Sequence, residues 1–299
     1  MKESMNPTAY LLLTAARNEE AHIEGTIQAV IAQTQKPVRW MIVSDGSVDR
    51  TDEIVSRYAA LHPFIELMRA SADPTRNFGS KARAINAAYE RVRRLDVSFV
   101  GVLDADVTFD PSYYAAVLQR MLDAPRLGLA GGMLFDWSDG QFIQQVTDPD
   151  WSVSGPIQLF RKDCFEAIGG YLPVRGGVDA VAEVMTRMKG WKVQAFPELH
   201  VMHHRQTGTE QRGLLSVFFQ RGIEDYQLGY QALFFAGHAL RRIREPPWLL
   251  GSLLMATGYA WAFLRRTPRK VPSDFIRYLH TEQWTRIRAR FYGRQGETL

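Results

Sequence analysis

The first two thirds of the chain alternate short apolar runs with longer segments in which apolar residues recur at helical spacing. The short runs predict four β-strands, at residues 10–15, 38–44, 64–69 and 97–103. The longer segments predict amphipathic helices, at residues 20–33, 51–61 and 80–93. Because strands and helices that alternate in this way pack as a sheet covered on both faces, we expect an α/β domain with a mostly parallel sheet.

The pattern changes after about residue 205, where long helical stretches replace the strands. The apolar, uncharged run at residues 248–264 reaches only the lower limit of about 17 residues for a transmembrane helix, and basic residues flank it on both sides. A helix that lies in the membrane interface, or a hairpin formed with residues 228–240, agrees better with this charge. A buried core helix is the alternative. We therefore predict two regions, residues 1–208 and 209–299, and expect the second to be helical and membrane-associating.

Basic residues are concentrated in the last third of the chain, although the formal net charge is only +4. They are Arg241, Arg242, Arg244, Arg265, Arg266, Arg269, Lys270, Arg277, Arg286, Arg288, Arg290 and Arg294. Such an asymmetry indicates an anionic surface or partner. Because no nucleic-acid-binding motif accompanies the charge, we expect an anionic membrane surface and no nucleic acid, at the cytoplasmic face of the cell membrane.

The composition is that of an ordinary folded protein, since 46% hydrophobic and 23% charged residues suffice for a substantial core in a chain of 299 residues. Cys164 is the only cysteine, which excludes an intrachain disulfide and agrees with a reducing compartment. The apolar run at residues 9–16 leads into a charged segment rather than a cleavage site, so we interpret it as a buried strand and not as a signal peptide.

Polar clusters follow three of the predicted strands, beginning at Arg17, Asp45 and Asp104. In parallel α/β sheets the ligand binds beyond the carboxyl ends of the strands. Asp104 and Asp106, separated by one small residue, can converge there on a hard cation such as Mg²⁺ or Mn²⁺, which would bridge diphosphate oxygens. Acidic pairs in turns often only cap helices, so the position at a strand end carries this prediction. Asp45 is a candidate for the base or ribose of a nucleotide, whereas Asp49 fits a helix cap better.

These clusters resemble the ordered motifs of the family 2 inverting glycosyltransferases. The matching segments are residues 13–20, 43–47, 79–86 and 103–106. The resemblance covers roughly residues 8–208 and implies the GT-A fold, a nucleotide-diphospho-sugar transferase domain with a mixed sheet. It also implies a nucleotide-sugar donor, with uridine as the favoured base, and a metal held by Asp104 and Asp106. The implied donor-binding residues are Ala15, Arg17, Glu19, Asp45, Lys81 and Asp104. Ser44 stands where the family usually has an acidic residue.

The second half of the site follows from the same resemblance. Val178 and Asp179 stand about twelve residues before Gly190 and Trp191, where members of the family carry an acidic pair before a Gly-aromatic dipeptide. Val178 replaces the first acid of that pair. An inverting transfer needs a carboxylate that deprotonates the acceptor hydroxyl, and Asp179 is our candidate. Glu183, one helical turn further on, is the alternative base, and a simple helix cap is the structural alternative for Asp179.

Four further residues are candidates of lower specificity. His203 resembles the histidine that some members supply to the metal, and alternation places it on the opposite face of its strand from His204. A structural histidine would give the same pattern. Arg205 fits either a phosphate contact or the start of the basic tail. Trp151 and Tyr171 could stack on sugar rings or pack in the core.

The leading prediction is an inverting, metal-dependent glycosyltransferase that moves a sugar from a UDP-sugar to a saccharide or lipid-linked acceptor, in polysaccharide or glycolipid assembly at the membrane. No Q-x-x-R-W signature of processive synthases is present, which favours addition of a single sugar. One alternative is a sugar-1-phosphate nucleotidyltransferase, which needs a glycine-rich loop that residues 15–19 lack. The other is a non-enzymatic, basic, membrane-bound scaffold.

Overall fold

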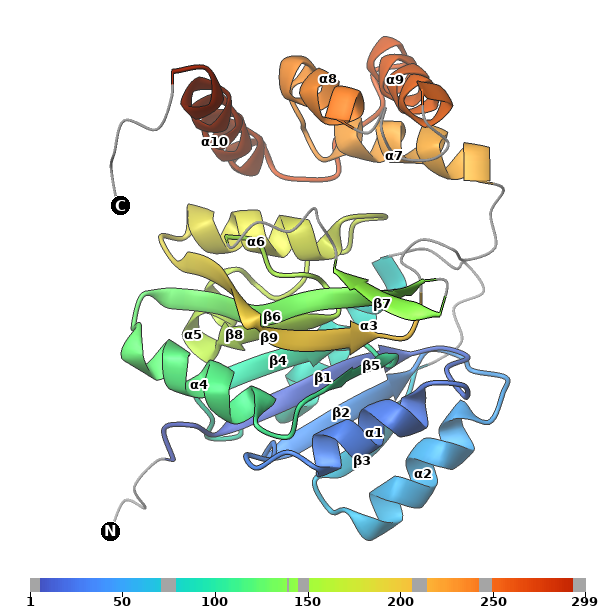
Figure 1. The fold of residues 1–299 in the computed structure, drawn as a ribbon, viewed down its shortest axis with the longest axis vertical. Helices are drawn as coiled ribbons and strands as arrows, with labels where there is room; N and C mark the ends of the chain where they lie inside the picture. Colours follow the sequence, from blue (N-terminus) through green and yellow to red (C-terminus); the bar gives the residue numbers. More distant parts are fainter. Residues whose placement is uncertain are drawn as a thin grey trace. The chain divides into compact units, whose positions relative to one another are not determined.

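The computed structural model describes residues 6–70, 79–138, 140–144, 151–205, 214–241 and 249–292. Contacts divide the chain into two units, the first made of Met1–Pro173 with Gly177–Gly208 and the second of Val174–Gly176 with Thr209–Leu299. The described part of the first unit holds the sheet, and that of the second is helical (Figure 1).

The first unit is built on a nine-stranded mixed sheet in its described residues, with the order β3-β2-β1-β4-β8-β6-β9-β5 and with β7 paired to β6. The strands are β1 (Tyr10–Ala16), β2 (Arg39–Ser44), β3 (Ile65–Arg69), β4 (Phe99–Leu103), β5 (Val107–Phe109), β6 (Leu127–Ser138), β7 (Gln141–Gln144), β8 (Ile157–Arg161) and β9 (Lys192–His203). All four predicted strands form, as the parallel set β1 to β4.

The expectation of a mostly parallel sheet is accurate only for this first half. β8 runs antiparallel to β4 and β6, β7 to β6, and β5 to β9, while β6 and β9 are parallel. For β7 the reason is local, because an antiparallel neighbour needs only a short connection, and Gly140, which directly precedes β7, has a φ of 85° that suits a tight turn. The sheet is therefore mixed, as the resemblance implied.

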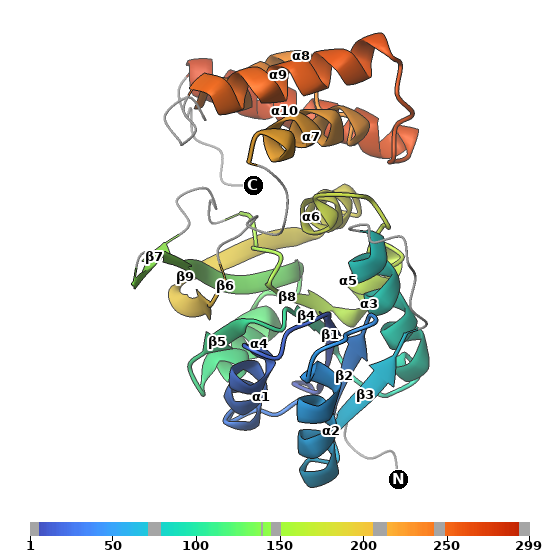
Figure 2. The ribbon, with the colours of Figure 1, turned by 90° about the vertical axis from the view of Figure 1, so that its right-hand side faces the viewer.

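Helices lie on both sides of this sheet (Figure 2). They are α1 (Ile23–Ile31), α2 (Thr51–Leu61), α3 (Gly79–Val92), α4 (Tyr113–Asp123), α5 (Lys162–Ala167) and α6 (Val178–Met188). The three predicted helices all form, but α1 begins at Ile23 rather than at residue 20. The preceding residues belong to a loop instead, in which the backbone N–H of Glu19 donates to Oγ1 of Thr51 at 2.8 Å.

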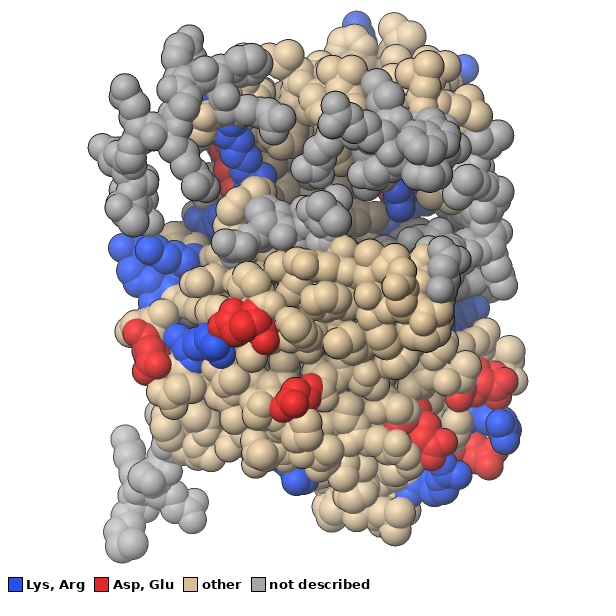
Figure 3. All heavy atoms as spheres, in the orientation of Figure 1, with Lys and Arg blue, Asp and Glu red and all other residues tan. Residues whose placement is uncertain are grey.

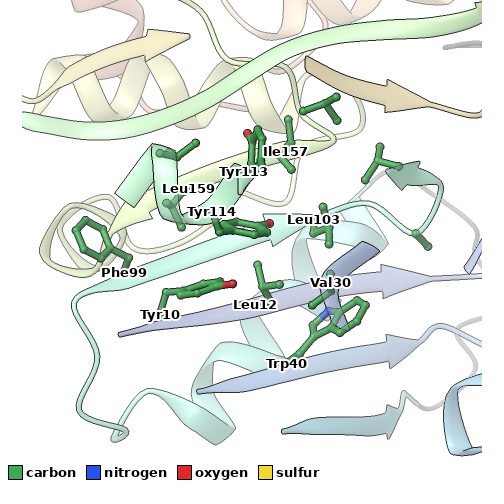
Figure 4. Close-up of a cluster of buried hydrophobic side chains, with 14 of the residues drawn as sticks. Tyr10, Leu12, Val30, Trp40, Phe99, Leu103, Tyr113, Tyr114, Ile157 and Leu159 are labelled. Carbon is green, nitrogen blue, oxygen red and sulfur yellow. The ribbon is translucent and has the colours of Figure 1, made fainter. Parts of the chain in front are cut away.

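The core of the sheet fixes β1 and β4 relative to each other (Figure 4). Tyr10 and Leu12 of β1 and Phe99 of β4 are fully buried, and Leu13 pairs in register with Val102. Gly101 permits this close packing, because a Cβ there would come within 2.5 Å of the side chain of Leu12. The carboxyl ends of β1 and β4 therefore emerge side by side, and the polar clusters that follow them are neighbours.

The second unit consists of α7 (Leu214–Gln227), α8 (Ala232–Arg241), α9 (Leu249–Leu264) and α10 (Ser273–Tyr292) in its described residues. Among the helices that the structure describes, none is long and apolar enough to cross a membrane. The predicted apolar segment is thus largely α9, although Trp248 at its start lies outside the described residues, as do Arg242, Arg244 and Arg294.

Candidate active site

The loops after β1 and β2 form one hydrogen-bonded unit. The backbone N–H of Asn18 donates to Oγ of Ser47 at 3.2 Å, and the backbone N–H of Val48 donates to Oδ1 of Asn18 at 2.9 Å. Asn18 adopts φ 55°, a left-handed conformation that asparagine tolerates. This turn brings Nη1 of Arg17 to 4.0 Å from Oδ2 of Asp45. Two of the predicted donor-binding residues therefore lie together, at the carboxyl edge of the parallel strands.

The remaining polar residues of these loops have structural partners. Asp49 accepts hydrogen bonds from the backbone N–H groups of Thr51 and Glu20 and so joins the start of α2 to the loop after β1, but the N-cap position of α2 belongs to Arg50. Ala15 pairs in register with Val43 near the end of β1 and is half-buried. Ser44, which replaces a family acid, is 3% exposed, so a carboxylate at that position would be buried in the sheet.

Asp104 and Lys81 form an ion pair at the end of β4. Nζ of Lys81, in the first turn of α3, donates to Oδ1 of Asp104 at 2.5 Å. Burial by itself would lower the pKa of Lys81, but the neighbouring carboxylate outweighs it, and the pKa is raised. Lys81 is therefore cationic at neutral pH. A fixed positive charge at this strand end suits a phosphate group.

Asp106 lies in a buried network that joins three strands. Its Oδ2 is 3.3 Å from Nε2 of His203, and Nδ1 of His203 is 2.7 Å from Oδ1 of Asp136. The sheet builds this arrangement, because His203 at the end of β9 pairs with Asp136 of β6 on one side and with Val107 of β5 on the other. Burial would lower the pKa of His203, but the two carboxylates raise it to about 9.

Asp136 is a residue that sequence reasoning missed. It belongs to none of the motifs, and 67 positions separate it from His203. The only signal was an acidic residue near the end of the long apolar run that forms β6. His204, by contrast, has a different partner from His203, since its Nε2 lies 2.8 Å from Oγ1 of Thr108.

Arg205 connects the first strand end to this network. Its Nη2 donates to Oε2 of Glu19, and its Nε lies 3.6 Å from Oδ2 of Asp106. Burial raises the pKa of Glu19 to about 7, against the opposing effect of the guanidinium. Glu19 and Asp106, which follow different strands, therefore both lie beside the guanidinium of Arg205. This contact explains the position of Arg205 without requiring it to begin a basic tail.

Asp179, in the first turn of α6, lies against the loop that precedes β8, next to the same strand ends. Gly155 leaves room for it, because a Cβ at Gly155 would lie 2.6 Å from Oδ2 of Asp179. The next residue, Pro156, accepts a hydrogen bond from the backbone N–H of Asp104 at 2.9 Å. The negative charge of Asp179 also contributes to the raised pKa of Lys81. The candidate base therefore lies within electrostatic reach of the Asp104–Lys81 pair.

Glu183, the alternative base, is occupied by structural contacts. Its side chain is 5% exposed and accepts hydrogen bonds from the backbone N–H of Val153 at 2.6 Å and from Oγ of Ser152. Nη1 of Arg187, one turn further along α6, lies 3.4 Å from Oε2 of Glu183. These contacts anchor the loop before β8 to α6. The carboxylate of Glu183 therefore has a structural role in the fold.

The pKa of Glu183 predicts a measurable effect on stability. Burial raises this pKa from 4.5 to about 7, so the folded chain binds the proton more tightly than the unfolded chain. Stability from this group is therefore greatest below pH 4.5 and is lost as the pH rises to about 7. Thermal unfolding between pH 5 and 8 should show that Glu183→Gln gains stability relative to the parent chain as pH rises, by roughly 2–3 kcal/mol over the range. A pH-independent difference would contradict the buried position of Glu183.

The two aromatic candidates, Tyr171 and Trp151, differ in burial. Tyr171 is 1% exposed, and its hydroxyl donates to Oε1 of Gln158 at 2.5 Å, so it belongs to the core. Trp151 is 45% exposed and remains a candidate for stacking on a sugar ring. Val178, which replaces the other family acid, is buried at the start of α6.

The donor set of Asp106 and His203 fits a divalent cation. A buried carboxylate oxygen is a ligand type that Mn²⁺ and Mg²⁺ prefer, whereas the nitrogen of His203, which carries a proton at neutral pH, becomes a ligand only when the cation displaces that proton, and it suits Mn²⁺ better than the harder Mg²⁺. Asp104, the other predicted ligand, pairs with Lys81 instead. Within the described ranges, no three or more His, Cys, Asp and Glu side chains converge closely enough to hold a metal ion. A cation at this point would therefore need further oxygens from a ligand, and a diphosphate could supply them.

Solved structures define the fold class. A mannosyltransferase from Pyrobaculum calidifontis, solved in complex with GDP-Man and Mn²⁺, superposes with a TM-score of 0.56 over 97% of this chain and 85% of its own, at 16% identity. TarS residues 1–349 of S. aureus superpose with a TM-score of 0.52 over 95% of this chain and 80% of that one, at 12% identity. At such identities the match shows the fold alone: an α/β fold of the GT-A type.

The family follows from the sequence. The model of glycosyl transferase family 2 matches residues 12–169, which is more than half of the chain and includes the strands and loops that carry Arg17, Asp45, Lys81, Asp104 and Asp106. The chain therefore belongs to glycosyl transferase family 2, and by family it is a glycosyltransferase. The two alternatives, a nucleotidyltransferase and a non-enzymatic scaffold, receive no support from these matches.

Curated relatives are similar over the same region. The beta-monoglucosyldiacylglycerol synthase of Synechocystis sp. is 27% identical over 203 residues, which are 61% of this chain and 41% of the relative. The poly-beta-1,6-N-acetyl-D-glucosamine synthase of Staphylococcus epidermidis is 28% identical over 202 residues, which are 62% of this chain and 45% of the relative. The chain thus aligns with less than half the length of these relatives.

Proposed function

We propose that the chain transfers a sugar from a nucleotide-diphospho-sugar to an acceptor hydroxyl, with inversion at the anomeric carbon. The observation that carries this proposal is the gathering of Asp104, Lys81, Asp106 and Asp179 beyond the carboxyl ends of the parallel strands. Ligands of open α/β sheets bind at this edge.

The nucleoside end of the donor would bind to the loops after β1 and β2. Arg17 and Asp45 lie together there and offer charged hydrogen-bonding groups to a base and ribose, with Ala15 and Glu19 beside them. Uridine is the base that the family resemblance favours. The diphosphate would then face the cationic Lys81, close to Asp104.

Mg²⁺ or Mn²⁺ would be held by Asp106 and His203, with Asp104 as a further ligand once a donor displaces its contact with Lys81. A bound cation would neutralise the negative charge that develops on the departing nucleoside diphosphate. Arg205 already lies at this point and supplies a second positive charge. Asp179 would accept the proton of the attacking hydroxyl, which increases the nucleophilicity of the acceptor oxygen.

The acceptor we propose is a saccharide or a lipid-linked saccharide, used in glycolipid or polysaccharide assembly. Relatives support this class, since their names describe a glucosyl-diacylglycerol synthase and a poly-N-acetyl-glucosamine synthase. The exposed Trp151 offers an aromatic surface of the kind that sugar rings stack on.

Donor binding and turnover test the proposed function. The purified chain should release nucleoside diphosphate from one member of a panel of UDP-, GDP- and dTDP-sugars, and only when Mg²⁺ or Mn²⁺ is present. Calorimetry on the same panel should identify the donor independently of the acceptor. Proton NMR of the first product formed should show the anomeric configuration opposite to that of the donor. Absence of both binding and release across the panel would overturn the proposal, and a retained configuration would overturn inversion.

Asp136 should affect metal affinity through His203. Carboxylates that orient a ligating histidine contribute about tenfold to a hundredfold to metal affinity, so Asp136→Asn is expected to weaken Mn²⁺ binding by that factor. Calorimetric titration with Mn²⁺ in the presence of the nucleoside diphosphate measures this directly. Asp96→Asn, at an exposed position, is the matched control and should leave the affinity unchanged. Equal affinities for the two variants would remove His203 from the proposed metal site.

A further inference from the structure

The outer face of α9 is more apolar than its inner face. Its exposed side chains include Leu249, Leu253, Phe263 and Leu264, which are between 57% and 79% exposed, together with Leu250 and Trp261 at about half exposure. A helix at the surface of a soluble protein normally directs its polar residues outward. The arrangement in α9 is the reverse, because bulky apolar groups point away from the rest of its unit.

The inner face of α9 explains why this orientation is fixed. Small residues form much of the contact with α7: a Cβ at Gly222 would lie 2.0 Å from the carbonyl oxygen of Met255, and one at Gly258 would lie 2.0 Å from that of Phe219. The two backbones therefore approach so closely that neither helix can rotate to bury leucines at this contact. Ser252 is also held inside, since its hydroxyl donates to the carbonyl oxygen of Ala239.

α8 continues the same apolar surface. Its exposed positions include Leu233 and Leu240, at 57% and 65% exposure, and Ala236 and Gly237 between them. Residues 232–240 and 249–264 together contain no Lys, Arg, Asp or Glu. In the upper right of Figure 3, where Figure 1 places α8 and α9, the atoms that are not grey are mostly tan, with isolated blue atoms at the edge. Single exposed leucines are ordinary in soluble proteins, but two helical stretches without a charged residue that both expose leucines are typical of an interaction surface.

Positive charge borders this surface at the end of α9. Arg265, Arg266, Arg269 and Lys270 follow the helix directly and are exposed. The guanidinium of Arg265 lies 5.7 Å from the centre of the Trp261 ring, so an aromatic and a basic side chain mark the same border. Tryptophan and arginine are the residues that anchor proteins at the level of lipid headgroups.

We propose that the outer face of α8 and α9 docks on an anionic lipid bilayer, with its leucines and Phe263 in the acyl region and the basic border at the headgroups. The proposal goes beyond sugar transfer and does not depend on it. The 16 residues of α9 span about 24 Å, less than the roughly 30 Å of a hydrocarbon core, so the helix lies in the interface rather than across it. The charge complementarity of the border selects a lipid surface over a purely apolar partner.

Flotation with lipid vesicles tests this docking surface. The full chain should float with vesicles of phosphatidylcholine and phosphatidylglycerol and much less with phosphatidylcholine alone. Leu253→Ser with Phe263→Ser should lower partitioning by about tenfold for each side chain. Leu61→Ser with Val38→Ser, which removes two exposed apolar side chains of the first unit, is the matched control and should bind as the parent chain does. Circular dichroism verifies that each variant is folded.

A second set of variants tests how much the basic border contributes to vesicle binding. Arg265→Gln with Lys270→Gln should lower binding to the anionic vesicles by about fivefold for each charge, and added salt should reproduce the loss. Arg126→Gln, on the first unit, is the control. Asp179→Asn should bind vesicles like the parent chain, which keeps this test separate from sugar transfer.

Two outcomes would overturn the proposal. One is flotation of the Leu253/Phe263 variant at the level of the parent chain. The other is sedimentation of the parent chain as a dimer without lipid, combined with loss of dimerisation in that variant and no vesicle binding by either protein. The second result would assign the face to a contact between copies of this chain.

Discussion

Replacing Asp179 with asparagine is expected to slow sugar transfer by about a hundredfold to ten-thousandfold, which is the usual contribution of a general base. Asparagine keeps the size of the side chain that packs against Gly155 but cannot accept the proton of the acceptor hydroxyl. Since Asp179 is not assigned to the nucleoside pocket, donor affinity should stay within a few-fold of the parent value. Steady-state rates with saturating donor and acceptor measure the loss, and calorimetry with the donor measures the affinity.

Glu183→Gln is the control for Asp179, because it changes a carboxylate of the same helix one turn away. Glu183 accepts hydrogen bonds from the loop at residues 152–153, and the amide oxygen of glutamine can accept the bond from the backbone of Val153. The rate should therefore change only a few-fold. If Glu183→Gln abolished transfer while Asp179→Asn left it intact, the base would be Glu183, and our assignment would be wrong.

The second large effect is expected at Asp106. Asp106→Asn should lower the rate of transfer by about a hundredfold to a thousandfold, the size of effect seen when a group that stabilises developing charge is removed. The substitution takes away the carboxylate that meets both His203 and Arg205. Transfer rates measured over a range of Mn²⁺ concentrations should show both a lower maximum and a higher Mn²⁺ requirement.

Asp96→Asn serves as the control for Asp106 as well, since it removes an exposed carboxylate outside the network. Far-UV circular dichroism and thermal unfolding should establish that Asp106→Asn folds, because the change lies in the buried environment of His203. A folded Asp106→Asn variant with the rate and metal dependence of the parent chain would exclude Asp106 from the metal and diphosphate site.

The elements of the first half could be predicted because their hydrophobic periods are regular. β1 to β4 are apolar runs separated by amphipathic helices, and a run such as residues 99–103 fits a buried strand of the predicted sheet. The second half was harder, because β5 to β9 pair without regular crossover helices, and direction in such strands depends on turns and long-range packing. The two long strands β6 and β9 meet although more than fifty residues separate their starts.

Residues of the site that follow predicted strands could be found from the sequence, whereas residues that arrive from elsewhere could not. Asp45 and Asp104 could be predicted because each directly follows an apolar run. The contact of Asp136 with His203 depends on the register of β6 against β9. A shift of that register by one residue would turn the side chain of Asp136 to the other face of the sheet. Gly155 likewise has a role only because the carboxylate of Asp179 comes to lie against it.

By itself the sequence determined the class of fold, the order of the motifs and the membership of glycosyl transferase family 2, because these depend on local periodicity and on residues close together in the chain. Tertiary structure alone decided which side chains meet: Lys81 with Asp104, His203 with Asp136, and Arg205 with Glu19. It also decided that α9 turns its glycines inward and its leucines outward, since a helix that is apolar all round carries no periodic signal of which face packs.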